Sequence, residues 1–159
     1  MQTIGFDSHD HARCITRTLR AAEAHCHAAR LQFTPVRRRV LEILLHEHRA
    51  LGAYDILETL AAEGLGAQPP VAYRALDFLV GNGLAHRIER LNAYAACAHP
   101  GRDHAPAFLI CRTCRLVAEA DTDPLRAPLI EAARATGFTI ERVAIEAEGL
   151  CPSCAADGA

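Results

Sequence analysis

The sequence predicts an α+β protein: an N-terminal winged helix-turn-helix domain, then a small C-terminal α+β dimerisation domain with a structural zinc on four cysteines. Four helical patterns and two short strand-like runs follow one another between residues 10 and 97. Two Cys-x-x-Cys pairs lie in the rest of the chain, each preceded by a strand-like run. Half of the 159 residues are hydrophobic, which suffices for a packed core in one ordinary domain or two small ones.

The N-terminal part begins with a helix that we expect over about residues 10–30. A second helix should begin at Thr34-Pro35, because threonine is a good N-cap and proline is tolerated at the first helical position. A third helix follows Gly52, and a fourth begins at Pro69-Pro70. The Gly81-Asn82-Gly83 run should end the fourth helix sharply.

Two strand-like runs, at about 84–89 and 93–97, follow the fourth helix and predict the wing. The fourth helix is then the recognition helix, and its apolar spacing leaves Tyr73, Arg74 and Asp77 on the outside. An arginine there could make a bidentate contact to guanine in the major groove. The alternative is that Tyr73 packs on the wing and Arg74 pairs with Asp77.

The C-terminal part should contain strands at 107–110 and 116–118, a helix over about 124–136 and a third strand over 138–147. We therefore expect a DNA-binding domain at 1–92, a hinge at 93–98 and a dimerisation domain at 99–159. Pairing through an exposed strand edge would stabilise so small a domain, and a two-fold dimer would suit a palindromic DNA site.

The two Cys-x-x-Cys pairs favour a closed metal site. Four thiolates on two tight turns suit tetrahedral zinc and leave no position for water or substrate, so such a site is structural. The pairs are further apart than the usual gap of about 15–20 residues, so the segment between them must fold to bring them together. Disulfides are the alternative. The four residues are Cys111, Cys114, Cys151 and Cys154.

A second set of possible ligands lies around the expected hinge: His86, Cys97, His99, His104 and Glu119. Nitrogen, sulfur and oxygen ligands of these types suit a mixed zinc site. Each residue alone also fits an ordinary role, such as a surface histidine, a small buried cysteine or a solvated acid. One zinc bound by residues from both halves of the chain would fix the two halves relative to each other.

Charge and hydropathy restrict the function further. Residues 11–40 contain seven arginines and one acid, whereas residues 93–159 contain six arginines and nine acids. A basic front fits nucleic-acid binding, although a solvated helix face would have the same composition. No run approaches the roughly 20 apolar residues of a membrane span, and the first thirty residues lack a signal-like core. We therefore expect a cytoplasmic protein that binds neither membrane nor small organic substrate.

Four segments resemble the ferric uptake regulator family, and within it most closely the zinc uptake regulator branch. The resemblance extends from about residue 15 to 154. It implies a homodimeric, zinc-responsive repressor whose metal-loaded form binds double-stranded operator DNA and represses zinc-uptake genes. The segments are Thr34-Pro35-Val36-Arg37, Ala53-Tyr54-Asp55-Ile56-Leu57, Tyr73-Arg74-Ala75-Leu76-Asp77-Phe78-Leu79 and Ile145-Glu146-Ala147-Glu148-Gly149-Leu150-Cys151.

The resemblance also implies roles for individual residues. It implies two zinc ions per subunit. The structural one falls on Cys111, Cys114, Cys151 and Cys154, which we call the knuckle cysteines. The regulatory one falls on His86, Cys97, His104 and Glu119, with His99 as an alternative to His104. It places DNA contacts at Tyr54 and Arg74, with Tyr73 and Arg37 near the DNA. The sequence departs from the family pattern at Glu148, where relatives often carry a histidine, which weakens the case for a third metal site.

Two other functions compete with this interpretation. Regulators of the same fold can sense iron, nickel or peroxide, but a cysteine ligand favours zinc over iron. A zinc hydrolase using the second ligand set would need an open position for water, and four protein ligands would close it. We therefore do not expect an enzyme.

Overall fold

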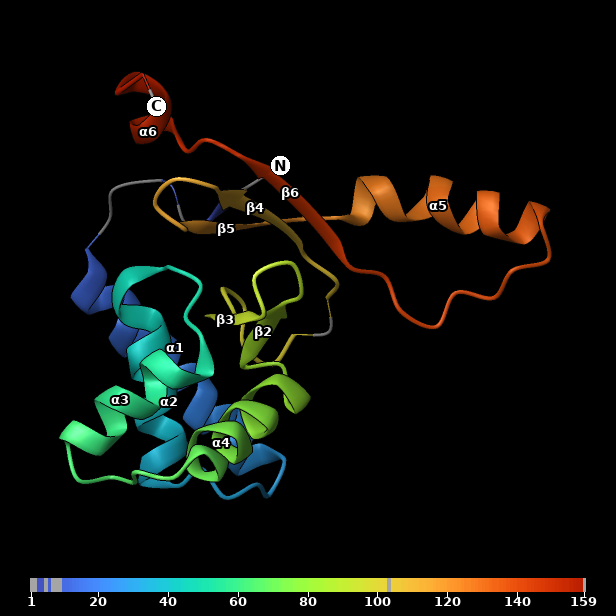
Figure 1. The fold of residues 1–159 in the computed structure, drawn as a ribbon. Coiled ribbons are helices and arrows are strands. Elements are labelled where there is room, and N and C mark those ends of the chain that lie inside the picture. The colour runs from blue at the N-terminus through green and yellow to red at the C-terminus, as the bar shows by residue number, and fades with distance from the viewer. Residues whose placement is uncertain (1–2, 5, 7–9, 103, 159) are drawn as a thin grey trace.

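The structure is a computed structural model that describes residues 3–4, 6, 10–102 and 104–158. Figure 1 shows a helical half with a two-stranded wing and, next to it, a sheet from which one helix projects. The helical half consists of α1 (His11–Ala28), α2 (Pro35–Glu47), α3 (Ala53–Ala62) and α4 (Pro69–Gly81), and the wing of β2 (Ala85–Ile88) and β3 (Ala93–Ala96). This confirms the predicted fold class.

The four helices begin where the sequence predicts. The Thr34 hydroxyl accepts the amide of Arg37 at 3.4 Å, and the Gly52 amide donates to Asp55 Oδ2 at 2.9 Å. After α4, Gly83 adopts a left-handed conformation, which lets the Leu84 amide donate to the Leu79 carbonyl at 2.8 Å. The shared core of the helices is fully buried and includes Leu41, Leu44, Ile56, Leu60, Leu76 and Leu79.

A four-stranded sheet forms the second half, in the order β1-β5-β4-β6. Its strands are β1 (Thr3–Ile4), β4 (Ala107–Cys111), β5 (Val117–Ala120) and β6 (Ile145–Gly149). Strands β4 and β6 are parallel, and α5 (Asp123–Ala135) lies in the connection between β5 and β6. Parallel strands need such a crossover, and here the helix projects away from the sheet.

The structure corrects the predicted third strand. Strand pairing begins at Ile145 and continues to Gly149, whereas we expected a strand over 138–147. The five residues of β4 pair one-to-one with Ile145–Gly149, so residues 138–144 extend beyond the end of β4. The sequence analysis also missed β1, which pairs with β5, and the short helix α6 (Pro152–Ala156).

The segment between α2 and α3 joins the two halves. Leu51 pairs with Tyr94 of the wing, while the Ala50 amide donates to the Arg115 carbonyl at 3.3 Å. The Val117 amide donates to the His48 carbonyl at 3.1 Å. A second apolar cluster spans this junction and contains Ala50, Ile88, Ala93, Ala95, Phe108, Ile110 and Val117.

Two sequence-based expectations concern the whole chain. Within the described residues, no helix combines the length and the apolar character that crossing a membrane requires. The division into 1–92, 93–98 and 99–159 stays a prediction; β3 lies within the predicted hinge.

Candidate metal centres and nucleic-acid interface

The four knuckle cysteines meet at one end of the sheet. Cys111 ends β4, Cys114 lies in the turn that follows, Cys151 is the N-cap of α6 and Cys154 lies within α6. All four Sγ atoms lie within 4.8 Å of one another, and those of Cys114 and Cys151 are 3.7 Å apart. Sulfurs bound about 2.3 Å from a tetrahedral zinc would be about 3.8 Å apart, so the spacing fits a zinc site made of four cysteines.

The thiols of this cluster differ in pKa because their sulfurs lie close together and have different hydrogen-bond partners. Backbone amides of Cys114 and Cys151 donate to the Cys111 sulfur and lower its pKa to about 6. The pKa of Cys154 is raised to about 12, first by its hydrogen bond with Cys151 and then by burial. All seven cysteines are free thiols, so the disulfide alternative has no support here.

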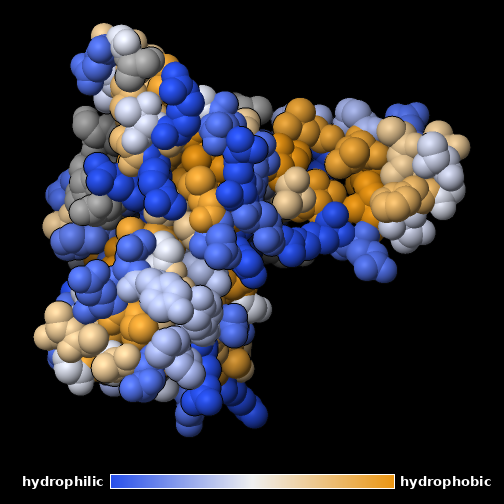
Figure 2. Space-filling view, in the orientation of Figure 1, coloured by the Kyte–Doolittle hydropathy of each residue, from blue (hydrophilic) through white to orange (hydrophobic). Residues whose placement is uncertain are grey.

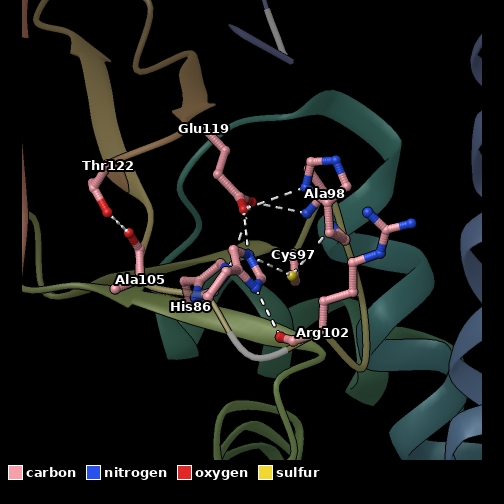
Figure 3. Close-up of polar contacts among 9 residues, drawn as sticks. His86, Cys97, Ala98, Arg102, Ala105, Glu119 and Thr122 are labelled. Carbon is pink, nitrogen blue, oxygen red and sulfur yellow. Dashed lines mark hydrogen bonds and ion pairs between the residues drawn. The ribbon is translucent and has the colours of Figure 1, made fainter. Parts of the chain in front are cut away.

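A second cluster forms where the wing meets the sheet. His86 comes from β2, Cys97 directly follows β3, His104 lies in the loop before β4, and Glu119 comes from β5. Their ligand atoms all lie within 4.8 Å of one another. His104 Nε2 is 2.6 Å from Glu119 Oε1 and 3.6 Å from Cys97 Sγ. Figure 3 shows Glu119 reaching from the sheet toward His86 and Cys97.

Backbone groups orient these side chains. The Arg102 carbonyl lies 2.8 Å from His104 Nδ1, which favours a proton on that nitrogen and leaves Nε2 free to bind a metal. The Ala98 amide donates to Glu119 Oε2 at 2.8 Å, and the His99 amide donates to Cys97 Sγ at 3.3 Å. Sequence reasoning missed the Arg102 carbonyl and the Ala98 amide, because backbone groups carry no side-chain signal.

One polar atom in this cluster has no hydrogen-bond partner among the described residues. His86 Nε2 is buried, and its distance of 3.6 Å from Glu119 Oε2 is too long for a hydrogen bond. Buried polar groups are normally satisfied, so an unsatisfied imidazole nitrogen facing a thiol and a carboxylate indicates a missing partner. A metal ion bound by these four side chains would supply it.

The buried ligands have strongly shifted acidities. Burial, and then the charge of Glu119, raise the pKa of the Cys97 thiol to about 12. Burial opposes ionisation of Glu119, but the nearby His86 imidazole, the Ala98 amide and His104 outweigh it and lower the pKa of Glu119 to about 2. The site therefore holds one carboxylate and one protonated thiol, and a bound cation would release the thiol proton.

His99 lies at the rim of this cluster. Its Nδ1 is 3.9 Å from Glu119 Oε1, and its side chain is much more exposed than that of His104. The geometry favours His104 as the ligand of the two.

The residues that we expect to contact DNA differ in how exposed their side chains are. Tyr54 on α3 and Tyr73 on α4 are 69% and 40% exposed, and Arg74 is exposed beside Tyr73. No ion pair joins Arg74 to Asp77 in the described part of the chain. Arg37, by contrast, is half-buried: its guanidinium lies 3.7 Å from the Phe78 ring centre and donates to the Gln32 carbonyl.

The chain is similar in sequence to known metal-uptake regulators. The profile of the ferric uptake regulator family matches residues 28–148. The zinc uptake regulation protein of Escherichia coli (strain K12) is 35% identical over 137 residues, which cover 86% of this chain and 80% of that protein.

Solved structures are also similar to this chain. A zinc uptake regulator complexed with zinc and DNA aligns with a TM-score of 0.85 at 34% identity, covering 91% of this chain and 97% of that one. Holo XcZur aligns at 0.80, covering 88% and 98%, and apo XcZur at 0.52, covering 90% and 99%, both at 36% identity.

Proposed function

This chain belongs to the ferric uptake regulator family, and from that membership we propose a zinc-responsive transcriptional repressor that binds operator DNA and represses zinc-uptake genes. It is a transcription regulator and not an enzyme. The observation that carries the proposal is the cluster of His86, Cys97, His104 and Glu119, because two of its members belong to the wing and two to the sheet half.

A zinc ion in this cluster would couple metal binding to the arrangement of the two halves. We call the arrangement in which the wing and the sheet half meet at this cluster the closed arrangement. Zinc that binds it better than arrangements in which the halves are apart increases its population, and DNA affinity rises by the same coupling. The comparison with XcZur supports this step. At the same 36% identity, the chain aligns much better with the holo structure than with the apo structure.

The ligand types favour zinc over the alternative metals. A thiolate with two imidazoles and one carboxylate suits zinc, whereas iron and manganese sites prefer nitrogen and oxygen ligands. Four protein ligands also leave no coordination position for the water that hydrolysis would need. We therefore propose two zinc ions per subunit, a regulatory one here and a structural one on the four knuckle cysteines.

We propose that the chain acts as a homodimer through α5 and the β6 edge. Leu125, Leu129 and Phe138 are 47%, 43% and 66% exposed, and apolar side chains gather on the projecting arm in Figure 2. A projecting helix with exposed apolar side chains gains stability by packing on a second copy. A two-fold dimer would present two recognition helices to successive major grooves.

Tyr54 and Arg74 are the side chains that we propose contact DNA, with Tyr73 beside them. Arg74 is on the outer face of α4, where it could read guanine. We propose that Arg37 supports this surface by packing α2 against α4 at Phe78.

The test is metal content measured together with DNA binding. Protein purified without added metal should retain one tightly held zinc per subunit, and loading of a second should switch on operator binding. One zinc per subunit with DNA binding indifferent to further metal would contradict the proposed function.

A further inference from the structure

The turn of the wing makes a second contact with the sheet half, apart from the metal cluster. The Glu146 carboxylate of β6 accepts the backbone amides of Glu89 and Arg90 at 2.7 and 3.0 Å. The Arg90 guanidinium donates to both oxygens of Glu148, at 2.8 and 3.3 Å. Arg142 donates to Glu89 Oε1 at 2.7 Å. We call these five residues the wing latch.

The wing latch and the metal cluster hold opposite ends of the same hairpin. His86 is in the second position of β2 and Cys97 directly follows β3, so the cluster lies at the open end of the hairpin. Glu89 and Arg90 form its turn, about 10 Å further along at roughly 3.3 Å per residue. Both attachments lead to the sheet half, so together they fix the direction of the hairpin.

The sheet side of the wing latch is well anchored. Glu146 and Glu148 alternate with Ala147 and therefore project from the same face of β6, which pairs with β4 at Phe108 and Ile110. Cys151 of the knuckle follows soon after Glu148 in the chain. The wing turn thus contacts side chains of a strand that is paired in the sheet.

Glu148 has a partner of its own in the wing latch. Its carboxylate pairs with Arg90 of the wing. Among the described residues only two clusters could hold a metal, and neither includes Glu148. Position 148 is an ion-pair partner here.

We propose that Glu146 and Glu148 are positioning residues that bias the metal-free protein toward the closed arrangement and so set the zinc concentration at which it switches. The proposal rests on the proposed function. None of the five residues is a ligand of the metal cluster, so their contacts stabilise the closed arrangement itself and not the bound zinc. Because apparent affinity falls with the fraction of molecules in the competent arrangement, loss of the wing latch lowers apparent zinc affinity.

The expected effect is moderate. An exposed ion pair such as Arg90–Glu148, with side chains 58% and 34% exposed, contributes little alone. The two backbone amide bonds to the Glu146 carboxylate add to it, because charge-assisted bonds exceed neutral ones. We expect their loss to raise the zinc concentration for half-maximal DNA binding about three- to tenfold.

Variants of Glu146 test the proposal first, in the whole chain. Glu146→Ala removes both amide acceptors, and Glu146→Gln retains one carbonyl oxygen and should restore part of the response. Glu141→Ala is the matched control, because it removes a nearby exposed acid that is not part of the wing latch. Operator binding is measured against buffered free zinc, together with zinc content and thermal unfolding.

A shifted zinc midpoint for Glu146→Ala, with unchanged zinc content and unchanged DNA affinity at saturating zinc, would support the proposal. A charge exchange, Arg90→Glu with Glu148→Arg, should restore the midpoint that each single change shifts. An unshifted midpoint would overturn the proposal, as would an equal loss of DNA affinity at every zinc concentration.

Small-angle scattering of the zinc-free protein separates this proposal from the proposed function. Glu146→Ala should have a larger radius of gyration than the wild type, and an identical radius would overturn the wing latch. If wild-type DNA binding ignores zinc, the proposed function fails, while the scattering comparison still tests the latch.

Discussion

Cys97→Ser should uncouple zinc from DNA binding without unfolding the protein. Cys97 is only 1% exposed and contributes the one sulfur in the second cluster. A serine hydroxyl is a poor zinc ligand at neutral pH, so the variant should retain one zinc per subunit. Loss of the coupling should reduce operator affinity at saturating zinc by roughly 5- to 150-fold, the usual range for about 1–3 kcal/mol.

The same thiol gives the wild type a characteristic pH dependence. The Cys97 pKa of about 12 means that the thiol is protonated at neutral pH and must lose its proton when zinc binds. Zinc affinity therefore rises with pH throughout the range below that pKa, by about tenfold per unit for one proton released. From about pH 7.5 to 9.0 it should increase about 30-fold, whereas Cys97→Ser should lack this proton's contribution.

Chelator competition at the two pH values, with operator binding by fluorescence anisotropy, measures both effects. Cys26→Ser is a suitable control, because Cys26 is also 1% exposed but lies in the helical core. A Cys97→Ser protein with wild-type zinc affinity, pH slope and DNA binding would refute the assignment of Cys97 as a ligand.

Three further predictions concern the knuckle, the recognition helix and the dimer. Cys111→Ser should lose the structural zinc and unfold at lower temperature, and a stable dimer with unchanged zinc content would contradict this. Arg74→Ala should weaken binding to the operator by about 1–3 kcal/mol, and binding to unrelated DNA by much less, if Arg74 reads a base. Equal losses of binding free energy on both would indicate a phosphate contact. Phe138→Asp should raise the dimer dissociation constant at least about tenfold, because it places a charge where apolar area would be buried. Sedimentation measures this constant.

Local sequence signals predicted the helical half well. Thr34 before Pro35, Gly52 and the glycines after Val80 fix where helices begin and end through bonds within a few residues. These contacts depend on neighbours in the chain, so the local sequence alone reveals them. The start of β6 could not be predicted in this way, because its partner β4 is distant in the chain.

The candidate metal site could also be predicted only in part. The ligand types and the family resemblance pointed to His86, Cys97, His104 and Glu119, and the fold brings all four together. Their supporting backbone groups and the wing latch depend on tertiary placement. An arginine and a glutamate 58 residues apart give no sign in the sequence that they will pair.

The sheet order β1-β5-β4-β6 has a consequence for synthesis on the ribosome. Its edges are the first and last strands of the described chain, so the complete four-stranded sheet cannot form until residue 149 has emerged. The helices and wing end at Ala96 and can fold earlier. At about 5–20 residues per second, the next fifty or so residues take roughly 3–10 seconds. Each new molecule thus has its helices and wing available for some seconds before its four-stranded sheet is complete.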